Sequence, residues 1–248
     1  MDLGLRDRVA LVTGASKGIG LGIARALSEE GASVAVSSSS RERIEAAAAA
    51  VGARPFVHDS SDLDAAPALI DAVEAELGPL AVLVTNTGGP PAGPDPLSFT
   101  VDQWEDTYRR LVLGPMALIE HALPAMRGRG FGRIVNVGSS AMREPIPNLM
   151  LSNAHRAGTL AAFKTLAPTA IADGVTLNTV LPGLIDTDRL AELMGGSEAV
   201  AGAAAATPAG RPGTVEELAA AAAFLCSERA SFITGTTVLV DGGRAQAT

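Results

Sequence analysis

The sequence predicts a single α/β domain in which a parallel sheet carries helices on both faces. Short apolar runs rich in β-branched residues alternate along the chain with helical patterns rich in alanine and leucine. This alternation is typical of a parallel sheet, because parallel neighbours need a crossover connection that is usually a helix. The 248 residues contain no stretch that reads as a linker between two domains. Hydrophobic residues make up 47% of the chain and aromatic residues only 3%, so we expect an aliphatic core.

Charge and cysteine content argue against several classes of protein. A formal net charge of −8 and the lack of a basic run argue against nucleic-acid binding, which needs clustered Lys and Arg. The N-terminus has no apolar signal core, and no apolar stretch reaches the ~18 residues of a membrane span. Cys226 is the only cysteine, which argues against disulfides and metal–thiolate sites. We therefore expect a cytoplasmic protein without nucleic-acid, membrane or metal partners.

The stretch VALVTGASKGIG at positions 9–20 predicts a strand, a tight turn and a helix. Gly14 allows a backbone conformation closed to other residues, while Gly18 and Gly20 remove side chains where a ligand and the helix approach closely. The N–H groups at the start of the helix favour an anion such as a pyrophosphate. An ordinary βα turn that needs glycine is the alternative. The strand before it and the helix after it favour a dinucleotide.

The second strand is expected at 33–37 and its helix at 42–51. The loop between them holds Ser38, Ser39, Ser40 and Arg41. An acidic residue here would bind the ribose 2′-hydroxyl and disfavour a 2′-phosphate, but this loop offers hydroxyls and a cation, with Lys17 close by. The pattern favours NADP(H) over NAD(H). Serines in a solvated turn are the alternative interpretation.

A third strand at 54–58, a helix at 63–77 and a fourth strand at 81–85 complete a βαβαβ half. In a parallel sheet the ligand site lies at the carboxyl ends of the strands. Gly14, Ser38, Asp59 and Asn86 all fall at that edge.

The second half continues the alternation. The proline-rich segment 90–96 is expected at the rim of the substrate site, and Thr100 and Gln103 form a capping-box pattern. A helix is expected from there to about Met126, with a kink or break at Pro115. Strands at 133–137, 175–181 and 236–241 alternate with helices at 153–172 and 215–226. The small residues of 188–213 predict a mobile helical lid.

Several motifs in this order resemble the classical short-chain dehydrogenase/reductases. They are TGASKGIG at 13–20, Asn86 after the fourth strand, Gly138-Ser139 after the fifth, PGLIDT at 182–187 and VDGG at 240–243. The segments NTGGPP at 86–91 and LSN at 151–153 resemble the β-ketoacyl-acyl-carrier-protein reductase-like branch.

The resemblance implies a Rossmann-type sheet of about seven parallel strands, a bound nicotinamide cofactor and a small carbonyl or alcohol substrate. It also implies a homotetramer, or a homodimer, with the helices flanking the fifth strand and the VDGG region buried between subunits. Taken together, the glycine loop, the second-strand loop and the motif positions give these expected cofactor-binding residues: Gly14, Ser16, Lys17, Gly18, Ile19, Gly20, Ser38, Ser39, Arg41, Asp59, Ser60, Asn86, Thr87, Gly88, Arg156, Pro182, Gly183, Ile185 and Thr187.

The catalytic positions depart from the family pattern. The family uses an asparagine, a serine, a tyrosine and, four residues after the tyrosine, a lysine. Here Ser139 is retained, but Leu111, Ser152 and Arg156 stand at the other three positions. A serine hydroxyl reaches only about 2.4 Å from its Cα, against roughly 6.5 Å for tyrosine, and its pKa is far too high for proton exchange near neutrality. Arg156 keeps the positive charge and can clamp ribose hydroxyls or an acidic group, but it cannot shuttle a proton.

His155 is the one histidine near these positions, and a histidine side chain can serve as an acid. The candidate catalytic residues are therefore Ser139, Ser152, Arg156 and His155, although packing is the simpler interpretation of His155. Three functions remain open at this point: an NADP(H)-dependent oxidoreductase with non-standard catalytic residues, a cofactor-binding protein without redox turnover, and an isomerase, dehydratase or cyclase on the same scaffold.

Overall fold

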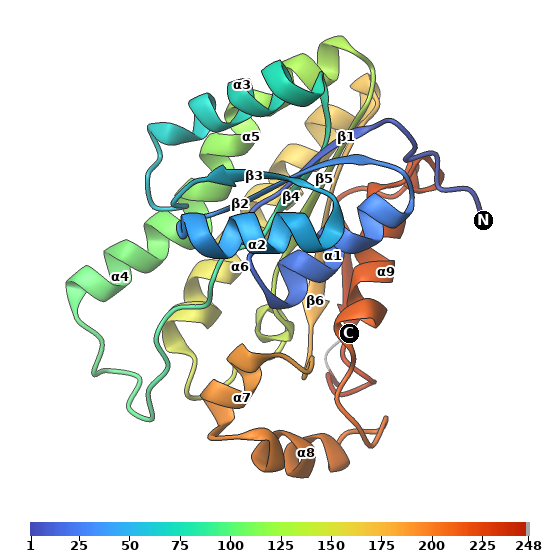
Figure 1. The fold of residues 1–248 in the computed structure, drawn as a ribbon. Coiled ribbons are helices and arrows are strands. Elements are labelled where there is room, and N and C mark those ends of the chain that lie inside the picture. The colour runs from blue at the N-terminus through green and yellow to red at the C-terminus, as the bar shows by residue number, and fades with distance from the viewer. Residues whose placement is uncertain (247–248) are drawn as a thin grey trace.

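The computed structural model describes residues 1–246 and contains one seven-stranded parallel sheet between two layers of helices (Figure 1). The strand order is β3-β2-β1-β4-β5-β6-β7, so the direction of progression reverses between β1 and β4. Ligands of open α/β sheets bind at such a reversal, beyond the carboxyl ends of the strands. The strands are β1 (Val9–Val12), β2 (Ser33–Ser38), β3 (Arg54–Val57), β4 (Leu80–Thr85), β5 (Gly132–Val137), β6 (Val175–Pro182) and β7 (Thr237–Val240).

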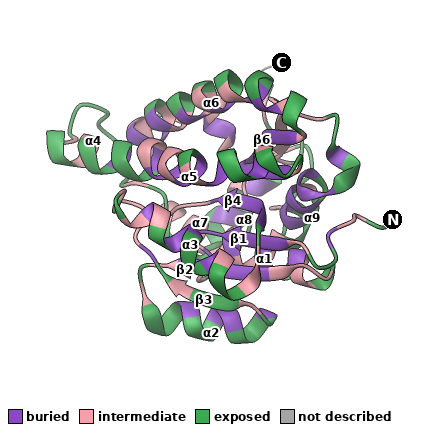
Figure 2. Ribbon diagram, turned by 90° about the horizontal axis from the view of Figure 1, so that it is seen from above, coloured by how far each residue is buried: buried purple, intermediate pink, exposed green. Residues whose placement is uncertain are grey.

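Alternate residues of the strands feed two aliphatic cores. Ala10 and Val12 of β1 point to one core, while Val9 and Leu11 point to the other, as the two-residue period of a strand requires. Figure 2 shows the buried strands between the layer of α5 and α6 and the layer of α1 and α2. The first core is covered by α1 (Gly18–Glu29), α2 (Arg41–Val51) and α9 (Val215–Cys226), and the second by α3 (Ala65–Leu77), α5 (Gly114–Gly128) and α6 (Met150–Ala170).

The helix expected to run from Thr100 to about Met126 is interrupted by a π-helical turn. Thr100 and Gln103 form the predicted capping box of α4 (Val101–Tyr108), and the π-turn η1 (Arg109–Leu113) leads into α5. Gly114 N donates to Arg109 O, five residues back, and Pro115 has no N–H to donate to Leu111 O. The predicted break is therefore a widened turn just before Pro115. It frees the Leu111 carbonyl for a partner outside the helix.

The α6 helix begins at Met150, three residues before the predicted start. Asn153, the predicted first residue, lies inside the helix, and its side chain binds the preceding loop. Its Nδ2 donates to Ile146 O at 2.8 Å, and Ile146 N donates to its Oδ1 at 3.3 Å. The correction places Ser152 inside the first turn of α6.

The segment expected to form a lid contains α7 (Asp188–Met194) and α8 (Ser197–Ala205). Figure 1 shows both helices beyond the end of β6, apart from the helices that cover the sheet. The mobility of this segment stays a prediction. The remaining short elements are the 3-10 turns η2 (Ser140–Met142), η3 (Ile171–Asp173) and η4 (Glu228–Ala230). Within residues 1–246, no helix combines the length and hydropathy needed to cross a membrane.

Candidate active site

The glycine loop between β1 and α1 is fixed by a residue from the end of β4. Asn86 Nδ2 donates to Gly14 O at 2.9 Å, and the Thr13 hydroxyl bonds both the backbone O and the backbone N of Asn86. Gly14 has a φ of +58°, and a Cβ there would lie 2.5 Å from Asn86 O. No side chain caps the N-terminus of α1. Its first N–H groups are therefore free to bind an anionic ligand.

Gly20 is required by close packing behind the loop, and its replacement by alanine is expected to disrupt the loop. A Cβ at Gly20 would lie 2.6 Å from Gly14 O and 2.7 Å from Asn86 Nδ2. Overpacking of this kind costs about 1–3 kcal/mol of unfolding free energy. We expect Gly20→Ala to lower the thermal midpoint and to weaken dinucleotide binding, measured by calorimetry and fluorescence titration.

Gly202→Ala is the matched control, because Gly202 lies in α8 and a Cβ there meets nothing within 4 Å. Equal midpoints and equal dinucleotide affinities for the two variants would contradict the packing argument.

Two adjoining cavities line the carboxyl edge of the sheet. The larger, of about 250 Å³, lies at the ends of β5 and β6, bordered by α7, and the smaller, of about 160 Å³, lies at the ends of β1, β2 and β3. Asn86 and Thr87 line both. The predicted residues Lys17, Gly18, Ile19, Arg156, Pro182, Gly183, Ile185 and Thr187 line the larger cavity, and Gly14, Ser16, Ser38, Ser39, Asp59, Ser60 and Gly88 line the smaller one.

Three of the predicted site residues do not line either cavity. Gly20 lies behind the loop, as described above. Arg41 begins α2 and pairs with Glu45 at 3.4 Å on the surface. His155 is buried, with its Nδ1 2.7 Å from Leu151 O and its ring 5.1 Å from that of Trp104. The structure thus gives His155 a packing environment against α4.

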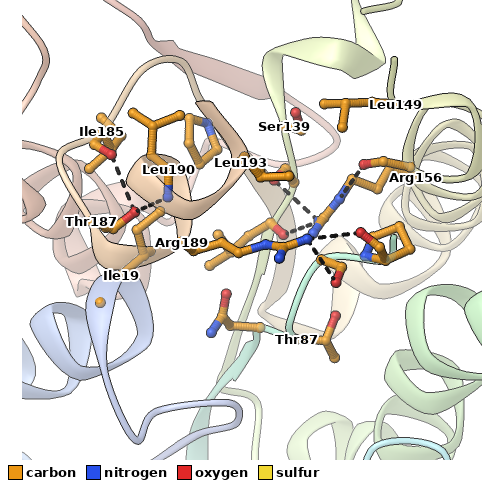
Figure 3. A pocket seen from close by; sticks show the side chains of 18 of the residues that line it. Ile19, Thr87, Ser139, Leu149, Arg156, Ile185, Thr187, Arg189, Leu190 and Leu193 are labelled. Carbon is orange, nitrogen blue, oxygen red and sulfur yellow. Dashed lines mark hydrogen bonds between the residues drawn. The ribbon is translucent and has the colours of Figure 1, made fainter. Parts of the chain in front are cut away.

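Arg156 is held at the end of β5 by three hydrogen bonds. Its Nε donates to Ser152 Oγ at 3.2 Å, and its Nη1 donates to Val137 O at 2.9 Å and to Gly138 O at 3.2 Å. No acidic side chain pairs with it among residues 1–246. Burial lowers the pKa of its guanidinium to about 10, so the group stays charged at neutral pH. Figure 3 shows Arg156, Ser139 and Leu149 together at one side of the larger cavity.

Ser139 follows the end of β5 and lies one residue beyond the carbonyl that Arg156 binds. Its Oγ accepts a hydrogen bond from Ala141 N at 3.2 Å, so its own proton is free for a ligand oxygen. Ser139, Ser152 and Arg156 all line the larger cavity. The structure therefore brings together three of the four candidate catalytic residues.

Leu111 occupies the position where the resemblance implies an asparagine. Its side chain is buried, and its carbonyl oxygen, freed by the π-turn, accepts a hydrogen bond from Thr159 Oγ1 at 2.5 Å. A cavity of about 10 Å³ lies between Leu111, Asn136, Arg156 and Thr159. The hydrogen bond from Thr159 connects α6 to the π-turn. Because residue 111 is leucine, this position offers no polar side chain.

Arg189 of α7 crosses the larger cavity to the opposite rim. Its Nη2 donates to Pro90 O at 2.9 Å, and Pro90, the first residue of the proline-rich segment, lines this cavity. Figure 3 shows Arg189 reaching from the side of α7 toward the middle of the cavity, together with Leu190 and Leu193 from the same helix. Lys17 Nζ lies 3.6 Å from Asp188 Oδ2 and 3.8 Å from Glu192 Oε1. These contacts hold α7 against both the glycine loop and the rim.

Arg189 and Arg110 line the cavities, but neither was a sequence candidate. Arg110 lines the smaller cavity and is held by Asp106 at 2.8 Å. The spacing of Asp106 and Arg110 by four residues was visible, yet it reads as an ordinary surface pair on a helix. Arg110 belongs to η1, and only the tertiary structure shows that it lines the smaller cavity together with Asp59.

Known proteins with the same features match nearly the whole chain. The family model described as "Enoyl-(Acyl carrier protein) reductase" matches residues 14–245. The 3-oxoacyl-[acyl-carrier-protein] reductase FabG of Haemophilus influenzae is 34% identical over 243 residues, which cover 96% of this chain and 98% of that protein. The chain belongs to the short-chain dehydrogenase/reductase family.

Solved structures of this family superpose closely on the chain. The 3-oxoacyl (acyl-carrier-protein) reductase of Agrobacterium tumefaciens, solved with NADP bound, has a TM-score of 0.91 at 32% identity, covering 98% of this chain and 96% of that one. A short-chain oxidoreductase of Pseudomonas aeruginosa, solved with NADPH and described as containing an atypical catalytic center, has a TM-score of 0.90 at 28% identity and 99% coverage of both chains. The predicted fold and family are thus confirmed.

The residues at the sheet edge fit a nicotinamide dinucleotide as the family would hold it. The glycine loop leaves an uncapped helix N-terminus, and residues of this loop line both cavities. The hydroxyls of Ser38 and Ser39 line the far end of the smaller cavity, and no acidic side chain of the 38–41 loop stands there. Asn86 and Thr87 line both cavities, so the two cavities adjoin along the carboxyl edge of the sheet.

Proposed function

We propose that this protein is an NADP(H)-dependent oxidoreductase that transfers a hydride between the nicotinamide and a small carbonyl compound, or its reduced product, using non-standard catalytic residues. The observation that carries the proposal is the placement of Ser139 and Arg156 together in the larger cavity, which adjoins the smaller cavity beside the glycine loop. Bound NADPH would supply the hydride. The pyrophosphate of NADPH would lie at the N-terminus of α1. Asn86 and Thr87 would lie between the adenosine half and the nicotinamide half of the cofactor.

The protein's own residues would bind and orient the substrate. The free hydroxyl of Ser139 would donate a hydrogen bond to the carbonyl oxygen of the substrate. The Arg156 guanidinium would stabilise negative charge on that oxygen. Leu149, Leu190 and Leu193 give the cavity an apolar wall. Such a wall suits the aliphatic part of an acyl or ketone substrate and excludes water near the reacting carbon.

NADP(H) is the favoured cofactor for two reasons. The 38–41 loop carries no carboxylate to repel a 2′-phosphate, and the Agrobacterium and Pseudomonas relatives were solved with NADP or NADPH. Arg110 adds a cation to the smaller cavity, while Lys17 faces the lid. The homotetramer or homodimer and the cytoplasmic location expected from the sequence stay predictions.

The proposal is tested by mixing the purified protein with NADPH and a panel of 3-oxoacyl thioesters, simple ketones and unsaturated ketones. We expect NADPH oxidation above background with at least one carbonyl compound, and tighter binding of NADPH than of NADH by fluorescence titration. Tight NADPH binding without oxidation across the panel would instead indicate a cofactor-binding protein without redox turnover.

The pH dependence of turnover is expected to report Arg156. Its guanidinium is charged below a pKa of about 10 and neutral above it, so stabilisation of negative charge is present at lower pH and is lost as pH rises through this value. We expect kcat to be flat from about pH 6 to 9 and to fall above about pH 10. A stopped-flow pH series at saturating NADPH measures this. A single ionisation near pH 6.5 would point to a histidine instead.

A further inference from the structure

The charged side chains that line the larger cavity are all lysine, arginine or aspartate. Within the described residues, those that line it are Lys17, Arg156, Asp188 and Arg189. Lys17 and Asp188 form an exposed ion pair with each other, and Arg189 is bound to the rim. None is a tyrosine or a histidine. A reaction at Ser139 must therefore obtain any proton from the solvent or from the substrate.

Arg156 is instead built as a fixed cation. Three hydrogen bonds to the protein use its Nε and Nη1 and anchor the guanidinium beside Ser139. The remaining terminal nitrogen, Nη2, has no hydrogen-bond partner among residues 1–246 and belongs to a group that lines the cavity. The same cavity is lined by Ser139, whose hydroxyl proton is also free, and an oxyanion is stabilised by two such donors.

This pair suits one of the two ways of reducing a carbonyl compound. Hydride addition to the carbonyl carbon of a saturated ketone leaves an alkoxide about as basic as hydroxide. This alkoxide must gain a proton as it forms. Hydride addition to the β-carbon of an unsaturated carbonyl leaves an enolate, whose charge is shared between oxygen and the α-carbon. Fixed donors are sufficient to stabilise an enolate, and water can protonate it afterwards. An arginine can stabilise the negative charge of an enolate, but it cannot donate the proton that an alkoxide needs.

We propose that the substrate is an α,β-unsaturated carbonyl compound and that Ser139 and Arg156 form an oxyanion site for its enolate. The inference rests on the proposed function, because bound NADPH is the reductant. A C–H bond forms at the β-carbon, the π-electron pair of the C=C bond moves to make the enolate, and a solvent proton adds to the α-carbon. The substrate gains two electrons, and NADPH loses them as a hydride.

A single probe distinguishes the two reductions. With NADPH and 2-cyclohexen-1-one, we expect cyclohexanone as the main product, and cofactor deuterated at both C4 positions should place deuterium at C3 of the ring. Gas chromatography with mass detection separates this from 2-cyclohexen-1-ol. Formation of the alcohol, or reduction of cyclohexanone at a comparable rate, would overturn the inference and leave the proposed oxidoreductase intact. If no carbonyl compound oxidised NADPH, both the proposed function and this inference would be overturned.

The oxyanion site also has a readout without turnover. 4-Nitrophenol resembles an enolate, and its phenolate absorbs near 400 nm. At pH 6 with NADP⁺ present, we expect 4-nitrophenol to ionise to its phenolate when it binds to the oxyanion site. Arg156→Met should reduce the phenolate signal at least tenfold and slow cyclohexenone reduction by about 100-fold, the typical effect of losing one oxyanion donor. Lys164→Met is the matched control, because Lys164 is an exposed cation two turns further along α6.

Two results would contradict the role of Arg156. One is an unchanged phenolate signal in a folded Arg156→Met protein, which circular dichroism and NADPH binding can verify. The other is an equal loss in the Lys164→Met protein, since that would assign the effect to overall charge. Arg156→Lys should fall between the two variants, because it keeps the charge but loses the fork that holds it to Val137 and Gly138.

Discussion

The triple variant Leu111→Asn, Ser152→Tyr, Arg156→Lys is expected to reduce saturated ketones at least 100-fold faster than the natural protein. Ser152 lies in the first turn of α6 and lines the cavity, and Arg156 lies one turn further on the same helix. A tyrosine at 152 would extend its hydroxyl into the space beside Ser139, with a lysine positioned to lower its pKa. A general acid placed in this way contributes about 10²–10⁴ in rate.

The measurement is kcat/KM for cyclohexanone and acetoacetyl-CoA, with the triple variant Leu111→Asn, Ser152→Phe, Arg156→Lys as control. The control fills the same volume without the hydroxyl. Equal rates for the two triple variants would show that the missing tyrosine does not limit ketone reduction in this protein. The natural protein should retain the higher ratio of C=C reduction over C=O reduction.

The second large effect is expected at the end of β2, where Ser38→Asp should change the ratio of NADPH to NADH affinity by about 100-fold in favour of NADH. Ser38 lines the smaller cavity, and its hydroxyl bonds Ser40 O at 3.3 Å. A carboxylate at this position would accept hydrogen bonds from the ribose hydroxyls of NADH and would repel a 2′-phosphate. Dissociation constants from fluorescence titration of both dinucleotides give the ratio.

Ser40→Asp is the control for added charge. Ser40 caps α2 by accepting a hydrogen bond from Arg43 N at 3.4 Å, and it does not line the cavity. Aspartate is equally good at an N-cap, so this variant should be stable and should keep its preference for NADPH. If both variants lose NADPH affinity equally, the preference is set by long-range charge and not by contact at Ser38.

Local sequence patterns were sufficient for the sheet, the glycine loop and the cofactor edge. The two-residue period of the strands and the helical period between them specify which side chains are buried, and carboxyl ends of parallel strands meet at one edge whatever the loops do. This is why Asn86, Ser139 and the 182–187 motif could be placed at the site before any contact was known. The departures at 111, 152 and 156 were located by the resemblance to the short-chain dehydrogenase/reductases, whose catalytic pattern supplies those positions.

Only the tertiary structure decided what the substituted residues do. Arg156 has its partners in the carbonyls of β5, and Arg189 reaches a rim 99 residues away in the sequence to bind Pro90. His155 turns toward Trp104, since residues one position apart on a helix point in different directions and Arg156 already faces the cavity. The Leu111 carbonyl is free because Pro115 lacks an N–H, but its partner Thr159 comes from α6. Spacing along the chain fixes which residues share an edge, whereas side-chain partners depend on which elements pack together.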